Sequence, residues 1–561
     1  MENTYNTQNK TNYLESISLR AKALLDKIDI TTLQNLPVNQ AIIILTLALS
    51  NKSYIVQVKE DSCTKALSIA IGKLLSTVES INENGLLRID LVIKLFDKIT
   101  LRSDSNVTLY NSNAGLLFDI NNGVAVTIEE LLSKGIINKN GITFFNKLLK
   151  LLSSKDNSIS TSEKRESIDA YPFECLTIIE NTSSHLSSLA YNNYLKVQPL
   201  DRKTLQNKKR ESMSYLAKHI NDDGAFDYIY NPVLDTCPDD YNLVRHAGTL
   251  YSMYQMLRKE PNEYFFDQAE KARKFLIEHI QVVNINAVER TCVVEANQAK
   301  LGGTALALVA LVEGSYVNRQ ATPLSLLQKL GDYIVSQQNT SGKFLANYLL
   351  EEQQYFEPNH IYYIGQAILA LVRLYKLDKN SKWLKSAELA AKFMINERKE
   401  IPIKKLPLDH WFMIVLPELY ILSPCKEFQE HMRNLAESMF VRPSKSFSIN
   451  CKYSRHKSAF KGTPTATKIE GLAAVAYLEA SQKNKLLAKR YLSYIEKAIR
   501  LILDFQLTAN NSMYFASPQL ALGGFKPSQY DFAIRIDFVQ HALSALIAFE
   551  KARRTFFNKN K

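Results

Sequence analysis

The sequence predicts a mainly α-helical protein, an (α/α)6 toroid preceded by a smaller N-terminal α/β or α+β domain. Between residues 210 and 550 the chain repeats one unit six times: an amphipathic helix, a short polar loop and a nearly all-apolar helix. Helices that are apolar almost all round belong inside a protein, and helices with one apolar face belong outside. Six of each in strict alternation favour an inner and an outer ring of helices over an open stack.

The individual helices follow from this pattern. The predicted inner helices are residues 241–257, 298–312, 359–375, 409–421, 468–480 and 536–548. The predicted outer helices are residues 211–220, 264–280, 324–338, 383–397, 426–440 and 486–505. Three of the loops before inner helices carry a Gly-x-Phe or Gly-Phe turn, at 224–226, 342–344 and 524–525, which predicts β-hairpins or turns on the rim where the inner helices begin.

The first 150 residues have a different pattern and predict the small N-terminal domain. Helices are expected at 13–27 and 63–80, and strand-like runs lie at 53–58, 87–93, 115–119 and 123–127. The last two runs flank an Asn-Asn-Gly turn, which is a hairpin signal. Residues 151–209 are predicted to be a linker and lead-in segment, in which 171–179 could form a strand, and residues 551–561 a basic tail after the toroid at 210–550.

Composition limits the possible partners. The net charge of +13 favours acidic ligands such as uronic acids or phosphates, but the Lys and Arg residues are spread along the chain and predict no nucleic-acid stripe. The six cysteines lie far apart without Cys-x-x-Cys or Cys-His spacing, so neither a metal site nor a disulfide framework is expected. The N-terminus carries no secretory signal, and the most apolar early run, 41–48, is too short to span a bilayer. We expect a cytoplasmic protein without a cofactor. The sequence leaves open export by a route that needs no signal peptide, and it leaves the oligomeric state open.

Polar side chains near the starts of the inner helices are the candidate site residues, because the rest of each inner helix is apolar. A lone histidine at a helix start is more often a cap or a hydrogen-bonded core residue. Four of the nine histidines, however, occupy equivalent places in successive units. We predict His246, His360, Asp409, His410, Asp537 and His541 as catalytic residues, and Tyr228, Tyr230, Asn242, Arg245, Glu295, Tyr363, Trp411 and Arg535 as substrate-binding residues.

The helix alternation, the segment 360–393, the Gly-Gly-Phe turn and the closing segment 535–549 resemble the six-hairpin toroid enzymes of carbohydrate metabolism. These include glucuronyl C5-epimerases, N-acylglucosamine 2-epimerases and unsaturated-glucuronyl hydrolases. The resemblance covers roughly residues 210–550 and implies an enzyme that acts on an acidic or amino saccharide through acid/base side chains of the toroid. The resemblance rests on the alternation of helices and on short sequence segments, which several families of this group share.

Two reaction types stay open at this stage. An epimerase needs a proton acceptor and a proton donor on opposite faces of the sugar, which two histidines could supply. A glycoside hydrolase needs two carboxylates, for which Asp235, Glu295, Asp409 and Asp537 are the candidates. A non-catalytic toroid that binds saccharides or proteins is the alternative from a different class, since a fold does not fix a function.

Overall fold

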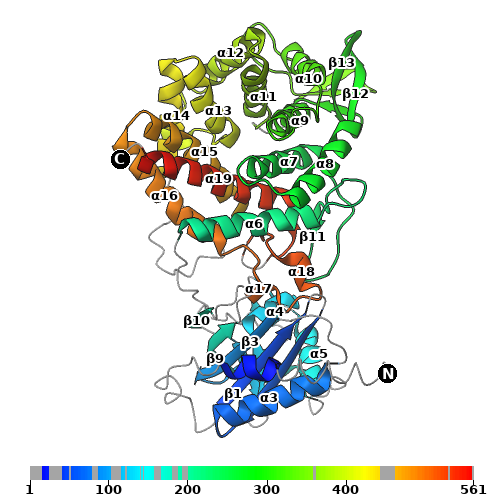
Figure 1. The fold of residues 1–561 in the computed structure, drawn as a ribbon, viewed down its shortest axis with the longest axis vertical. Coiled ribbons are helices and arrows are strands. Elements are labelled where there is room, and N and C mark those ends of the chain that lie inside the picture. Colours follow the sequence, from blue (N-terminus) through cyan, green and yellow to red (C-terminus); the bar gives the residue numbers. More distant parts are fainter. Residues whose placement is uncertain are drawn as a thin grey trace.

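The computed structural model describes a toroid of helices and a β-sheet that lies against one side of it (Figure 1). The described residues are 16–23, 41–49, 52–78, 86–102, 115–119, 123–138, 141–142, 144–156, 166–179, 187–191, 200–357, 362–441, 462–528 and 531–558.

Six apolar helices form the inner ring. Each inner helix packs against the next one along the chain, and the last, α19, packs against the first, α7, so the ring is closed. Every residue of α9 is buried, as expected for a helix with no polar face. The inner helices are α7 (Leu243–Leu257), α9 (Leu301–Ser315), α11 (Tyr362–Asp378), α13 (His410–Leu422), α15 (Gly462–Ser481) and α19 (Ile536–Asn558).

Six amphipathic helices surround this ring and bury one face each. Several begin with a side-chain cap: Asp201, Asn262 and Asn484 each accept a hydrogen bond from the backbone N–H three residues ahead. The outer helices are α6 (Arg202–Lys218), α8 (Glu263–Glu278), α10 (Leu324–Ser336), α12 (Ser381–Glu397), α14 (Lys426–Val441) and α16 (Lys485–Leu503). The predicted (α/α)6 toroid is therefore confirmed.

Some boundaries differ from the predicted ones. Helix α6 begins at Arg202, inside the segment predicted as lead-in, and α19 continues to Asn558, into the segment predicted as a basic tail. The first three residues of the predicted helix 298–312 form strand β14 (Gln298–Lys300) instead. They pair with β15 (Asn347–Leu349) of the following unit, and such pairing competes with the helix for the same backbone groups.

Short β elements line the rim where the inner helices begin. Strand β11 (Ile229–Tyr230) pairs with β17 (Ile534–Arg535), which joins the first and last units. A five-stranded sheet runs in the order β12 (Ile280–Ile285), β13 (Val288–Glu295), β14, β15 and β16 (Gln354–Phe356). Each glycine turn lies between two residues that form an isolated antiparallel β-bridge, such as Ile220 with Phe226. Gly224 has φ +87°, and a Cβ there would lie 2.3 Å from the carbonyl oxygen of Lys271, so only glycine fits.

The N-terminal region holds an antiparallel sheet with β2, β1, β3, β9, β5 and β6 in that order, while β4 and β10 also pair with β9. Helix α3 (Cys63–Thr77) packs against β1 and β2. The segment predicted as a linker contains the long strand β9, which lies between β3 and β5, so the predicted strands 87–93 and 115–119 do not pair directly. The bounds are β1 (Ala41–Ala48), β2 (Ser53–Glu60), β3 (Leu86–Leu95), β4 (Ile99–Arg102), β5 (Gly115–Asp119), β6 (Val124–Thr127), β9 (Ser167–Ile179) and β10 (Ser187–Tyr191).

Further short elements complete this region. They are α4 (Ile128–Ser133), α5 (Phe145–Lys155), β7 (Ile137–Asn138) and β8 (Gly141–Ile142).

The sheet contacts the toroid through the loop that precedes α19. In this loop, which contains α17 (Ala509–Ser512) and α18 (Pro518–Ala521), Tyr514 is buried with its ring 5.4 Å from the Arg88 guanidinium. Arg88 in turn makes a double hydrogen bond with buried Asp90 on β3, at 2.7 and 2.8 Å. None of the helices in the described part of the chain is both long and apolar enough to cross a membrane.

Candidate functional site

Two histidines from different inner helices face each other at the rim. His410 is the first residue of α13 and His541 lies in the second turn of α19, and their imidazole centroids are 5.1 Å apart with the planes at 81°. Both side chains are mostly buried. The aromatic rings of Trp411 and Tyr362 lie 4.8 and 5.4 Å from that of His410. Tyr362 is 42% exposed, so solvent reaches this side of the pair.

A buried carboxylate orients one member of the pair. Glu470 of α15 lies with Oε1 2.6 Å from Nδ1 of His541, and burial raises the pKa of Glu470. Donation from Nδ1–H to the carboxylate fixes the imidazole plane and leaves Nε2 of His541 for another partner. The sequence analysis noticed Glu470 near an inner-helix start but did not include it among the site residues. A buried carboxylate in an otherwise apolar helix was the signal that could have selected it.

The other member of the pair is held in the neutral form by its surroundings. Burial, and then the neighbouring His541, lower the pKa of His410 well below its ordinary value. Its Nε2 is buried and makes no hydrogen bond with the described residues. An unpaired buried nitrogen of this kind costs about 1–3 kcal/mol, which binding of a hydroxyl or carbonyl group could recover.

A second cluster lies beside the pair on the same rim. Asp537 and His541 are four residues apart on α19 and so share a helix face. Asp537 binds the guanidinium groups of both Arg535 (2.6 and 3.0 Å) and Arg245 (3.2 Å). Arg245 also donates to the Tyr228 hydroxyl at 2.7 Å. Two arginines share one carboxylate, and the Arg245 side chain is 37% exposed, so part of this cationic cluster is open to solvent.

Three predicted site residues make hydrogen bonds or ion pairs within the toroid. His246 is fully buried against α8: its Nδ1 lies 2.7 Å from the Tyr241 hydroxyl and its Nε2 2.9 Å from the Ala272 carbonyl oxygen. Burial lowers the pKa of His246 to about 4. Asn242 caps α7, and Glu295 accepts from the Leu243 N–H while pairing with Lys300, so these side chains have no contact with the histidine pair.

Asp409 is completely buried as well. It caps α13 by accepting from the Phe412 N–H at 3.1 Å, and its Oδ2 has no hydrogen-bond partner among the described residues. The Arg398 guanidinium is 4.0 Å away. Burial dominates over this weak pairing and raises the pKa of Asp409 to about 7. The carboxyl group therefore caps the helix that carries His410 and has no exposed surface.

The remaining predicted residues have different surroundings. Trp411 lies beside the histidine pair, with its ring 6.1 Å from that of His541. Tyr230 donates to Asp235, and Tyr363 donates to Glu357. His360 lies outside the described residues.

Ion pairs join neighbouring inner helices at the opposite end of the toroid. Arg373 near the end of α11 binds Glu313 of α9 at 2.9 Å and Glu418 of α13 at 2.6 Å. Cations at helix C-termini are favourable there, and Arg373 and Lys376 hold the pKa of Glu418 at about 2. The first turns of the inner helices thus contact one another at one end of the toroid, and their last turns contact one another at the other end. The histidine pair and this ion-pair network therefore lie at opposite ends of the toroid.

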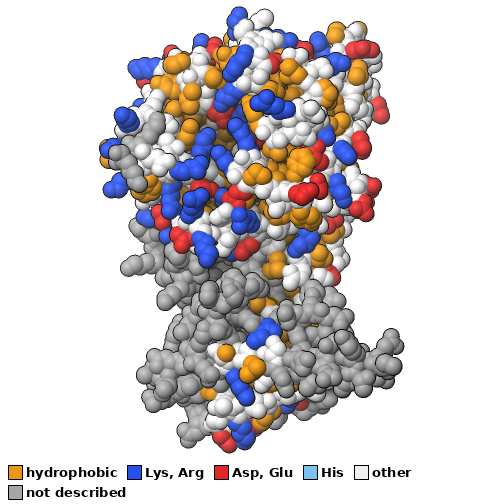
Figure 2. Space-filling view, viewed as in Figure 1, with side chains coloured by type: hydrophobic (Ala, Val, Ile, Leu, Met, Phe, Trp, Pro, Cys, Tyr) orange, Lys and Arg blue, Asp and Glu red, His pale blue; other side chains and the backbone are white. Residues whose placement is uncertain are grey.

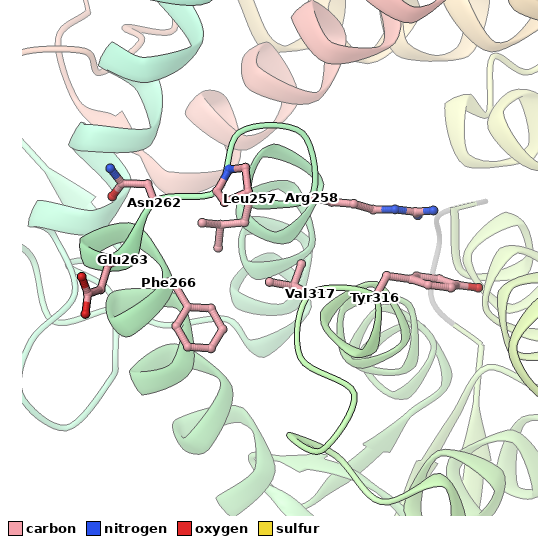
Figure 3. A pocket seen from close by; sticks show the side chains of 8 residues that line it. Leu257, Arg258, Asn262, Glu263, Phe266, Tyr316 and Val317 are labelled. Carbon is pink, nitrogen blue, oxygen red and sulfur yellow. The ribbon is translucent and has the colours of Figure 1, made fainter.

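A cavity of about 350 Å³ also lies at this far end, between the loops that follow α7 and α9 (Figure 3). Leu257, Phe266 and Val317 give it an apolar lining, and the Arg258 guanidinium lies 4.3 Å from the centroid of the Tyr316 ring. It contains no pair of acid/base side chains in reach of each other. We therefore place the candidate site at the histidine pair.

No model of a protein family matches the chain, and no curated protein matches its sequence. In structure it is similar to a D-mannose isomerase, which is 12% identical, with a TM-score of 0.48 over 63% of this chain and 98% of that one. A cellobiose 2-epimerase from Spirochaeta thermophila is 15% identical, with a TM-score of 0.43 over 63% and 98% of the two chains. An unsaturated glucuronyl hydrolase specific for heparin is 12% identical, with a TM-score of 0.44 over 63% and 99%. These are six-hairpin toroid enzymes, the group that the sequence resembles.

Proposed function

We propose that the protein is a carbohydrate-active enzyme that epimerises or isomerises an anionic saccharide through His410 and His541. The observation that carries the proposal is the facing pair of imidazoles, one neutral with an unpaired nitrogen and one held by a carboxylate. Epimerisation beside a carbonyl group removes a proton from carbon with one side chain and returns a proton to the same carbon with another. Two imidazoles at the same rim provide these two groups.

The two histidines have different roles in this proposal. His410 is kept neutral by burial and acts as the proton acceptor. His541 acts as the donor, and the Glu470 carboxylate supplies the counter-charge for its imidazolium form. After burial, repulsion from His541 is the second cause that lowers the pKa of His410.

The hydrolase alternative has weaker support because each candidate carboxylate is already engaged. Glu295 pairs with Lys300, Asp537 lies between two arginines, Asp409 is fully buried, and Asp235 accepts from Tyr230 and Ser517. Glycoside hydrolysis requires one carboxyl group that protonates the leaving oxygen and a second that faces the sugar carbon.

The arginine cluster supports an anionic substrate. Arg245 and Arg535 each keep guanidinium N–H groups that Asp537 and Tyr228 do not use, and a uronic acid carboxylate would accept from them. Tyr362 and Trp411 offer aromatic surface beside the same pair.

Proton exchange tests the proposal directly. The protein would be incubated in D2O with a panel of uronic and amino sugars, and deuterium incorporation and epimer formation followed by NMR. We expect both with an acidic sugar, and we expect His410→Asn and His541→Asn to abolish epimer formation while Lys392→Gln, an exposed control on α12, retains it. Turnover without deuterium incorporation would contradict the two-base mechanism. Binding without any turnover would assign the toroid to the non-catalytic class.

A further inference from the structure

One side of the toroid carries most of the net charge of the chain. Helix α6 has six basic residues (Lys and Arg) and one acidic residue. Helix α16 has five basic residues and one acidic residue, and α19 has three basic and two acidic residues. These three helices thus hold ten of the thirteen net positive charges. They come from distant parts of the sequence, but α19 packs against both α6 and α16. Lys and Arg side chains gather over these helices in Figure 2.

Ion pairs neutralise only part of this basic face, which we define as the exposed surface of α6, α16 and the end of α19. Glu260 pairs with Lys209 and Arg210, and Glu437 pairs with Arg490. The acidic residues of the three helices are already engaged: Glu211 with Lys208, Glu496 with Arg500, Glu550 with Lys209, and Asp537 within the candidate site. Several exposed cations of this region make no ion pair with the described residues. They are Arg202, Lys203, Lys483, Lys485, Lys489, Lys497 and Arg554. Like charges this dense repel one another, so they favour an anionic partner.

Two large apolar side chains project among these cations. Leu486, between Lys485 and Lys489 at the start of α16, is 81% exposed. Phe557, three residues after Arg554 near the end of α19, is 58% exposed. Both lie at the far end of the toroid from the histidine pair, because α16 begins and α19 ends there. The Lys551 ammonium, 4.0 Å from the Tyr477 ring centroid near the end of α15, places the end of α19 beside that of α15.

We propose that the basic face binds the surface of an anionic phospholipid membrane, with Leu486 and Phe557 entering the headgroup region. Lysine and arginine side chains near an anionic bilayer are attracted to its surface potential. Exposed apolar side chains among those cations gain by entering the interface, which contact with a sugar–phosphate backbone does not offer them. The rim with the histidine pair then points away from the membrane into the aqueous phase.

Vesicle co-sedimentation of the full-length protein tests this proposal. We expect binding to vesicles of phosphatidylcholine with one third phosphatidylglycerol, no binding to phosphatidylcholine alone, and a decline at high salt. Each removed cation should weaken binding about fivefold. The triple variant Lys485→Gln, Lys489→Gln, Arg554→Gln should therefore bind about a hundredfold more weakly. The matched control Lys274→Gln, Lys329→Gln, Lys392→Gln removes three exposed cations from α8, α10 and α12 and should bind as the unchanged protein does.

A second variant separates a membrane from other polyanions. Leu486→Ser with Phe557→Ser should weaken vesicle binding and leave binding to a nucleic-acid duplex unaltered. The proposal is overturned by equal binding to neutral and anionic vesicles, or by an equal loss of vesicle binding in the triple variant of the basic face and in its matched control. It is also overturned if the serine variant binds vesicles normally and the duplex binds as tightly, which would assign the face to nucleic acid.

Discussion

Replacing Asp409 with asparagine should stabilise the toroid progressively as the pH rises from about 4 to about 7. The Asp409 carboxyl group is fully buried, and burial raises its pKa from 3.8 to about 7. A folded chain that holds this proton more tightly than the unfolded chain loses stability as the pH rises between these two values. Asparagine does not ionise, and it caps a helix about as well as aspartate does.

The pKa values set the size of the effect. A rise from 3.8 to about 7 corresponds to about 4 kcal/mol of unfolding free energy, gained by the variant at pH 7 and above and absent near pH 4. The amide has the same shape as the carboxylic acid. It therefore fits against Gly365. The space there is tight, because a Cβ added to Gly365 would lie 3.0 Å from both oxygens of the Asp409 carboxyl group.

Urea unfolding of both proteins across this pH range measures the difference. The chain has only two tryptophans, Trp383 and Trp411, and both are buried in the toroid, so tryptophan fluorescence reports the unfolding of this part alone. We also expect the variant to retain turnover, because a carboxyl group with no exposed surface does not touch a substrate.

Two results would refute this reasoning. A stability difference that is the same at all pH values would mean that Asp409 does not titrate in the range set by its burial. Loss of turnover with unchanged stability would instead make Asp409 a catalytic residue, as the sequence alone predicted.

The remaining predictions concern one further histidine, one carboxylate and one glycine. His246→Ala should lower the free energy of unfolding by about 3 kcal/mol and leave turnover intact, because it deletes a buried side chain with two hydrogen bonds; the same urea assay and a rate measurement check this, and lost activity at normal stability would contradict it. Glu470→Gln should reduce turnover and change the pH–rate profile, because the amide supplies no counter-charge for His541, and an unaltered profile would exclude this role. Gly365→Ala should destabilise the toroid by about 2 kcal/mol, since the added Cβ would lie 2.7 Å from the Phe412 nitrogen; Gly72→Ala in α3, with open space around it, is the control and should not destabilise, and equal thermal shifts in the two would exclude a steric cause.

The positions of the twelve toroid helices could be predicted from the sequence because burial leaves a local record. Residues 301–315 have no polar face, and α9 is buried along its whole length, whereas the sequence of α16 shows one apolar face and one charged face. Periodicity of this kind repeats within a few residues and does not depend on which helix becomes the neighbour. The count of six inner and six outer helices then made a closed ring the simplest arrangement.

Helix rotation, by contrast, is decided by tertiary packing. His246 and His410 both lie near the start of an inner helix, but His246 is the fourth residue of α7 and His410 the first of α13. Each residue turns a helix by about 100°, so this offset directs one histidine to α8 and the other to His541. A sequence-based boundary is uncertain by a few residues, which is enough to reverse the face to which a side chain belongs.

What the sequence by itself determined is thus the toroid and its alternation of helices, because both depend on local hydrophobic pattern. The tertiary structure alone decided which acid/base side chains meet. It joined Glu470 to His541 across 71 residues, placed β9 in the middle of the N-terminal sheet, and assembled the basic face from α6, α16 and α19. These are contacts between residues distant in sequence, and they arise only when the ring closes and the sheet selects its strand order.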